Sequence, residues 1–154
     1  MNSIARQKKS AATKREPFAY VIAFHGDRFI MVRHKDRKWE MPGGRLEKNE
    51  THEQAAEREF VEETGRTLDI VDCMDIDGGK VCVGLAGPKI RDKLSEEIAE
   101  VRELQELPSE LSFPLVEYET LLAKARNIME TFKRGEAING SASPRQNRPD
   151  DRSR

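Results

Sequence analysis

The sequence predicts an α/β fold in which one mixed β-sheet carries helices on both faces. Three observations support this prediction. Runs of β-forming residues stand both before and after a strongly acidic helix pattern in the middle of the chain. A second, longer helix pattern follows the last of these runs. The length of 154 residues, with no internal repeat, suits a single domain with a sizeable core.

Charge and hydropathy narrow the function classes. Charged and apolar residues each make up 36% of the chain and the net charge is −1, which argues against general nucleic-acid binding. No apolar run is long enough to span a bilayer, and the basic N-terminal segment lacks the apolar core of a signal peptide. We therefore expect a globular cytoplasmic protein without a membrane partner.

The two ends differ in composition from the middle. Residues 1–16 carry five Lys or Arg side chains and no apolar periodicity, so we predict a flexible basic tail. Residues 135–154 are rich in Ser, Pro, Asn, Arg and Asp, which predicts a disordered C-terminal tail. The folded domain is thus assigned to residues 17–134.

The folded part is predicted to begin with a β-hairpin. Residues 18–24 and 28–33 are rich in β-forming residues, and Gly26-Asp27 between them supplies a turn. A charged loop and a short strand at residues 38–41 should follow. They lead to Pro42-Gly43-Gly44, where we expect no regular structure and an exposed backbone.

The acidic helix that comes next has recognisable ends. Thr51 suits the N-cap position, and Gln54 three residues later completes a capping box. Gly65 suits a left-handed C-cap. The apolar side of this helix consists of three residues: Ala55, Ala56 and Phe60.

Three carboxylates share one face of the acidic helix, because Glu59, Glu62 and Glu63 stand at positions i, i+3 and i+4. Like charges at this spacing repel and cost stability unless a cation lies among them. Oxygen ligands suit a hard divalent ion such as Mg²⁺ or Mn²⁺, and carbonyl groups of the glycine loop could add to them. A solvated acidic helix face is the alternative, since runs of Glu are common on helices.

The remaining elements are two strands at residues 68–75 and 81–87, a late strand at 99–106 and a helix from Pro114 to about Lys133. The largely apolar second run predicts an interior strand of the sheet. Leu107-Pro108 ends the late strand.

Three side chains with chemical potential are given structural interpretations. Cys73 and Cys82 lack a zinc or disulfide spacing and are expected to be reduced thiols on strands, buried or half-buried. His34 could ligate a metal ion, but a single histidine in a charged loop is more often solvated.

The spacing around the acidic helix resembles the signature of the Nudix hydrolase superfamily. Five residues separate Gly44 from Glu50, and seven more lead to Arg58-Glu59. The match continues through Phe60, Glu62-Glu63 and Gly65, and it is preceded by a similar lead-in, Trp39-Glu40-Met41-Pro42-Gly43-Gly44. Arg66 departs from the pattern, which usually has an apolar residue there, and Leu68 could take its packing role.

The resemblance implies an α/β/α sandwich over roughly residues 17–134 and a set of site residues. The metal ligands would be the carbonyl groups of Gly43 or Gly44 and the acids Glu50, Glu59, Glu62 and Glu63. The catalytic residues would be Glu63, Glu59, Arg58 and Glu97, with Arg58 mainly pairing with the acids around it. The general base would be Glu63 or Glu59, and Glu97 in a later loop is a looser candidate.

The short chain, the lead-in and the segment Glu106-Leu107-Pro108 resemble the MutT-like branch. This implies a Mg²⁺-dependent hydrolase of nucleoside triphosphates, including 8-oxo-dGTP, that releases the monophosphate and pyrophosphate. Aromatic residues could line a base pocket or serve as core: Phe18, Tyr20, Phe24 and Phe113. An RNA 5′ end, a dinucleotide or a nucleotide sugar is an alternative substrate, and a non-catalytic binding module is an alternative function. A homodimer is compatible with the sequence.

Overall fold

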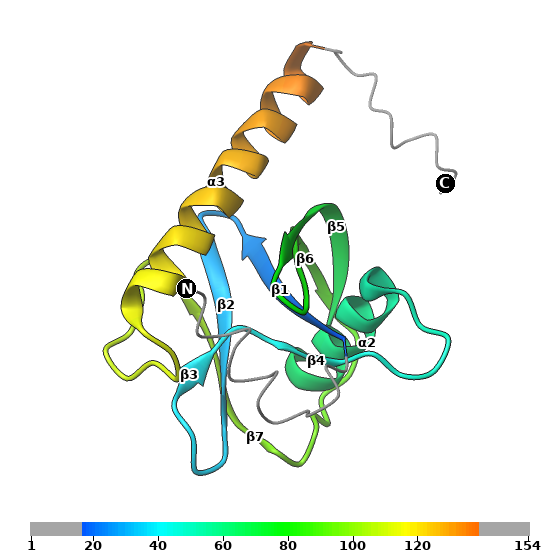
Figure 1. The fold of residues 1–154 in the computed structure, drawn as a ribbon, viewed down its shortest axis with the longest axis vertical. Helices are drawn as coiled ribbons and strands as arrows, with labels where there is room; N and C mark the ends of the chain where they lie inside the picture. The colour runs from blue at the N-terminus through cyan, green and yellow to red at the C-terminus, as the bar shows by residue number, and fades with distance from the viewer. Residues whose placement is uncertain (1–16, 139–154) are drawn as a thin grey trace.

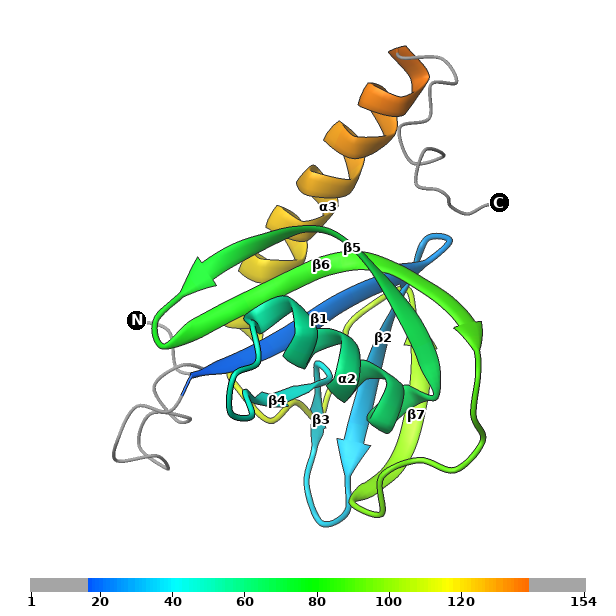
Figure 2. The same cartoon turned by 90° about the vertical axis from the view of Figure 1, so that its right-hand side faces the viewer.

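The computed structural model describes residues 17–138, and they form one mixed sheet with a helix on each face (Figures 1 and 2). The predicted α/β class is confirmed. The predictions for residues 1–16 and 139–154 lie outside the described part. No helix within residues 17–138 combines the length and apolar character needed to cross a bilayer.

The elements follow one another as β1 (Phe18–His25), β2 (Arg28–His34), β3 (Trp39–Glu40), β4 (Gly43–Arg45), α2 (His52–Thr64), β5 (Arg66–Ile76), β6 (Gly79–Lys89), β7 (Ile98–Leu104) and α3 (Leu115–Ile138). The main path of the sheet is β3-β2-β1-β6-β5, while β4 pairs with β1 and β7 pairs with β2. Strands β1 and β6 run parallel, and the other pairs are antiparallel. The run at residues 81–87 is therefore an interior strand, as predicted.

Strand β1 divides the core because its side chains alternate between the two faces of the sheet. Ala19, Val21 and Ala23 pack with the apolar side of α2. The even-numbered residues pack with α3, in a cluster that contains Phe18, Tyr20, Ile22 and Phe24. One strand thus supports the acidic helix on one face and a largely aromatic cluster on the other.

The expectation that residues 42–44 lack regular structure is wrong, because Gly43 and Gly44 belong to β4. Gly44 lies opposite Ala19 and Gly43 opposite Tyr20 on β1. A side chain at Gly43 would overlap the carbonyl oxygen of Ala19. The missing Cβ therefore allows this tight pairing, and the pairing fixes the glycine segment beside α2.

Several boundaries differ from the sequence predictions. Strand β5 begins at Arg66 rather than at Leu68, and β6 extends by two residues beyond each end of the predicted run 81–87. Strand β7 ends at Leu104, before the expected end at 106, and α3 continues to Ile138, beyond the expected end near Lys133.

Cys73 and Cys82 are both free thiols, as expected. Cys73 is half-buried on β5, and Cys82 is buried opposite it on β6.

Candidate active site

The ends of α2 are held by the predicted caps. The Thr51 side chain accepts a hydrogen bond from the amide of Gln54, and the Gln54 side chain accepts one from the amide of Thr51, both at 3.0 Å. Gly65 adopts φ 80°, and its amide donates to the carbonyl of Val61. Both ends of the helix are fixed, so the carboxylates in its last two turns have a rigid base.

Arg58 organises the acids around it. Its guanidinium forks onto Glu50, with Nε to Oε2 at 2.6 Å and Nη2 to Oε1 at 2.9 Å. The Nη1 atom lies 3.0 Å from Glu59 Oε2 and 3.5 Å from Glu62 Oε1, and Nη2 also donates to the carbonyl of Arg45. Arg58 is expected from the sequence to pair with acids around it, and in the structure its partners include Glu50 and Glu62. The hydrogen bonds from Arg58 lower the pKa of Glu50, and Glu50 in turn raises the pKa of Arg58.

The pKa of Glu59 is raised above that of an ordinary glutamate. Burial and then the charge of Glu63 raise its pKa to about 7, in spite of the contact with Arg58. Its carboxylate occupies the space beside Gly44, where a Cβ atom would overlap the carboxylate oxygens. The glycine therefore leaves room for this acid next to the backbone of β4.

Glu63, one turn later on α2, is buried against the same backbone segment. Its Oε1 accepts a hydrogen bond of 3.2 Å from the amide of Gly43. Its Oε2 lies 3.4 Å from Nε2 of His34, whose Nδ1 lies 3.5 Å from Oε2 of Glu40. Contacts with Glu40 and then Glu63 raise the pKa of His34 to about 9.

The expectation that His34 is solvated is wrong, since only 8% of the residue is exposed. Strand β2 extends through His34 and turns its ring under the last turn of α2. Glu40 is also buried, and it receives further contacts from Arg37 at 3.1 Å and from the hydroxyl group of Ser112 at 3.3 Å. Glu40 stands in the lead-in motif, but nothing in the sequence indicated that it meets His34, since that contact depends on the pairing of β2 with β3.

Glu62 and Glu97 lie farther from the centre of this cluster. The Glu62 side chain is 41% exposed. Glu97 is exposed, and its backbone is held by hydrogen bonds: the carbonyl accepts from the amide of Lys35, and the amide donates to Ser95 Oγ. Because the amide of Ser95 donates to the carbonyl of Glu62, this loop is fastened to the end of α2. The structure thus brings the loop of Glu97 to the site, without a contact between its carboxylate and the other acids.

The donor set suits a hard divalent cation. Glu59 and Glu63 present carboxylate oxygens from neighbouring turns, next to the backbone of Gly43 and Gly44. Burial first, and then the charge of Glu63, raise the pKa of Glu59, and a cation bound here would favour its ionised form. Among residues 17–138, no three acid, histidine or cysteine side chains converge into a ready-made metal cage. Binding of a metal ion would therefore need rotamer changes of these acids.

Arg66 joins a polar network instead of the apolar packing expected at its position. Its guanidinium donates to the carbonyl of Gly87 at 2.8 Å and contacts Glu103 at 3.2 Å. Leu68 is 8% exposed and packs in the cluster that contains Phe60. The departure at Arg66 is thus accommodated, with Leu68 in the apolar role.

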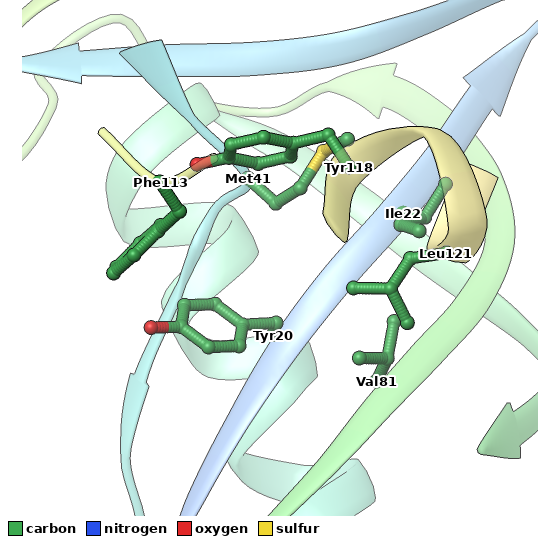
Figure 3. Close-up of a pocket in the computed structure, with 7 residues that line it drawn as sticks. All are labelled: Tyr20, Ile22, Met41, Val81, Phe113, Tyr118 and Leu121. Atoms are coloured by element: carbon green, nitrogen blue, oxygen red, sulfur yellow. The ribbon is translucent and has the colours of Figure 1, made fainter. Parts of the chain in front are cut away.

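An apolar pocket lies on the face of the sheet that α3 covers (Figure 3). It is lined by Tyr20, Ile22, Met41, Val81, Phe113, Tyr118 and Leu121. Its free volume is about 10 Å³, room for roughly one water molecule. Burial and then the charge of Glu40 raise the pKa of Tyr20, and the charge of Glu63 contributes as well.

Two of the four aromatic candidates, Tyr20 and Phe113, line this pocket. Phe18 is in the core cluster and packs edge-to-face on Tyr20, with 5.2 Å between the ring centroids. Phe24 lies at the other end of β1, beside a second cavity near Arg126 and Met129. Phe18 and Phe24 are therefore core residues that do not reach the pocket.

Comparison with known proteins gives one family and several relatives. The family model described as NUDIX domain matches residues 14–118. Over 46 residues the chain is 46% identical to YtkD of Bacillus subtilis (strain 168), which is provisionally named an 8-oxo-dGTP diphosphatase. The matched stretch covers 30% of this chain and 29% of that protein. Over 57 residues it is 46% identical to the 8-oxo-dGTP diphosphatase of Proteus vulgaris, with 34% of this chain and 49% of that protein covered. The chain thus spans less than half the length of either relative.

A solved structure with a similar fold is that of a mutant form of the pyrophosphohydrolase BsRppH from Bacillus subtilis. The TM-score is 0.59 at 21% sequence identity, over 76% of this chain and 82% of that one. At this identity the likeness concerns the fold.

Proposed function

The chain belongs to the Nudix hydrolase family, and on that premise we propose that it is a Mg²⁺-dependent nucleoside triphosphate pyrophosphohydrolase that accepts oxidised purine nucleotides such as 8-oxo-dGTP. Mn²⁺ would serve in place of Mg²⁺, because both ions prefer oxygen ligands. The products would be the nucleoside monophosphate and pyrophosphate. Two relatives with 8-oxo-dGTP diphosphatase names support this substrate class over the stretches that match.

One observation carries the proposal: the acids of α2 and the apolar pocket lie on either side of the same short backbone segment. Gly43 contacts Glu63 through its amide, and Met41, two residues earlier, lines the pocket. A nucleotide with its phosphates over α2 would therefore have its base directed toward Tyr20 and Phe113. A phosphate chain and a base are the two parts that a nucleotide presents for recognition.

The acids of α2 are suited to bind a metal ion and to transfer a proton. We assign Glu59, Glu62 and Glu63 as metal ligands, with a carbonyl group of Gly43 or Gly44, and Glu50 as a supporting acid that Arg58 fixes. When bound, the divalent ion would withdraw charge from the diphosphate and acidify a water molecule. Glu59 and Glu63 lie together in the acidic cluster and are the preferred general bases, ahead of Glu97, which is exposed.

The base would enter a pocket that is nearly closed. A purine needs far more than the present 10 Å³, so Phe113 or the first turn of α3 must move outward when nucleotide binds. Hydrogen bonds to β3 hold the segment before α3. The amide of Ser112 and the hydroxyl group of Tyr118 donate to the carbonyl of Trp39, the amide of Trp39 donates to the carbonyl of Glu110, and the hydroxyl group of Ser112 donates to Glu40. An outward shift of this segment would therefore have to break some of these bonds.

A substrate panel tests the proposal. The wild type would be assayed with Mg²⁺ against 8-oxo-dGTP, dGTP, a dinucleoside polyphosphate, a nucleotide sugar and a triphosphorylated RNA, with monophosphate and pyrophosphate measured separately. We expect turnover of 8-oxo-dGTP, with release of pyrophosphate, and a loss of about 100-fold or more in kcat for Glu63→Gln. Glu119→Gln, at an exposed position on α3, is the matched control and should behave as the wild type.

The outcome that would contradict the proposal is specific. Preference for the RNA end by kcat/KM would assign the enzyme to RNA processing, and preference for the nucleotide sugar would assign it to diphosphates of that type. Full activity of Glu63→Gln on every substrate would remove the metal-binding role of this acid.

A further inference from the structure

His34 lies between two buried carboxylates that come from different elements. Glu63 belongs to the last turn of α2, and Glu40 ends β3. The imidazole Nε2 is 3.4 Å from Glu63, and Nδ1 is 3.5 Å from Glu40. The side chains of all three residues are at most 10% exposed, so water contributes little to their solvation.

Each ring nitrogen of His34 faces one of these two acids. Nδ1 is shielded from solvent and makes no hydrogen bond within residues 17–138, so the 3.5 Å contact with Glu40 is electrostatic. A buried carboxylate is stable only when donors or cations satisfy it, and the Gly43 amide supplies one oxygen of Glu63 only. The second oxygen of Glu63 faces the imidazole. The position of Glu63 therefore depends on His34 as well as on β4.

Glu40, the acid on the other side of His34 from Glu63, contacts residues near the pocket. Glu40 is held by Arg37 and Ser112, and its charge acts on the phenol groups of Tyr20 and Tyr118. The contacts Glu63–His34–Glu40 thus connect the proposed metal-binding acids with the structure that lines the pocket.

We propose that His34 is a positioning residue, whose Nε2–H group holds Glu63 in the orientation that metal binding needs while Glu40 fixes the imidazole from behind. This role rests on the proposed function, since it presupposes that Glu63 ligates a divalent ion. Partners of this kind orient ligating carboxylates, and their loss typically costs about 10- to 100-fold in metal affinity or activity.

Two amide substitutions separate positioning from packing. The amide nitrogen of Gln reaches the place of the imidazole Nε2, whereas that of Asn reaches the place of Nδ1. His34→Gln therefore retains a donor for Glu63, and His34→Asn retains a donor for Glu40 alone. Both remove the ring, so both should lower the melting temperature to a similar degree.

The measurement is Mn²⁺ affinity, by titration of each variant with the metal alone, followed by kcat and KM with the preferred nucleotide. We expect His34→Asn to bind Mn²⁺ about 10-fold or more weakly than the wild type and to lose kcat by a similar factor, with KM little changed. His34→Gln should recover most of both losses. His25→Gln is the control, because His25 is half-exposed, far along β1, and pairs with Glu103.

Each outcome decides the question. Equal losses in His34→Gln and His34→Asn, tracking the melting temperature, would show that the ring only packs. Wild-type affinity in both variants would also overturn the role. A wild type that neither binds Mn²⁺ nor hydrolyses any nucleotide would remove the proposed function and this role together, and it differs from the first two results because the failure already appears in the unmutated protein.

Discussion

Arg58 and Glu50 form a two-point ion pair, with Nε to Oε2 at 2.6 Å and Nη2 to Oε1 at 2.9 Å, that ties the middle of α2 to the loop before it. The carboxylate of Glu50 also accepts from the amide of Glu47, so the loop is closed upon itself. This pair sets the position of the guanidinium, whose remaining nitrogen reaches Glu59 and Glu62. The arrangement explains why an arginine can lie among these acids and still leave Glu63 to other partners.

Replacement of Arg58 by Lys should destabilise the protein. An ammonium group cannot fork onto Glu50, so at least one charge-assisted hydrogen bond is lost, and the free energy of unfolding should fall by about 1–3 kcal/mol. Urea denaturation of the metal-free protein measures it. Arg134→Lys, at an exposed i,i+4 pair with Glu130, should change stability by less than about 0.5 kcal/mol. Equal effects of the two substitutions would show that the fork contributes nothing special.

Gly44→Ala should impair activity more than stability. The new Cβ atom would overlap the carboxylate of Glu59, a flexible group that can move aside, so the fold should survive while Glu59 leaves its place. We expect kcat to drop about 10-fold or more, with a small change in melting temperature. Gly135→Ala on α3 is the control, because a Cβ there meets no atom within 4 Å. Unchanged kcat in Gly44→Ala would mean that the position of Glu59 does not matter.

The metal-free protein should lose stability as pH rises. Glu59 keeps a proton in the folded state up to about pH 7 that it releases near 4.5 when unfolded, so its contribution is present below about 4.5 and is lost as pH rises through 7. The pKa of His34 is raised from 6.5 to about 9, and its contribution is lost as pH rises through 9. Unfolding in urea with EDTA at pH values from about 5 to about 9 measures the trend.

Two variants assign that trend. Glu59→Gln should flatten the lower part of the pH profile, and His34→Asn the upper part. Added Mg²⁺ should restore stability most at high pH, where the acids are ionised. A profile in EDTA that rises across this pH range would contradict the sign for both groups.

Phe113→Ala should weaken nucleotide binding at the base. Loss of one aromatic contact with a purine is worth about 1–1.5 kcal/mol, so KM should rise about 10-fold while kcat changes little. Phe24→Ala is the matched control: it removes the same ring from the far end of β1, where it should cost stability and leave KM unchanged. Steady-state kinetics with 8-oxo-dGTP provide the comparison. A rise in KM for Phe24→Ala alone would place the base elsewhere.

Local rules predicted the acidic helix and most strands from the sequence. The Thr51–Gln54 capping box and the C-cap at Gly65 depend on neighbours within four residues, and both are present as expected. Strand β1 is likewise predicted from its own β-forming residues. By contrast, the pairing of Gly43 and Gly44 with β1 depends on a segment much earlier in the chain. The glycines that signal a loop in isolation here permit close strand contact.

The environment of His34 could not be deduced from the sequence for a related reason. Its burial depends on Glu40 through strand pairing and on Glu63 through the docking of α2, and neither contact has a fixed spacing that a motif would display. The identities of the acids were readable, whereas their partners required the fold. Roles of the individual acids in metal binding and proton transfer stay predictions.

The alternation along β1 restricts where this enzyme can acquire a different substrate preference. Insertion of a single residue into β1 would exchange its two faces, placing bulky rings beneath α2 and small alanines in the pocket, so both halves of the site would fail at once. Phe113 and Leu121 border the same pocket from outside the sheet and belong to the part of the core that α3 covers. Substitutions around residues 111–121 should therefore change the preferred base more readily than substitutions in β1, which would disturb both faces of the sheet.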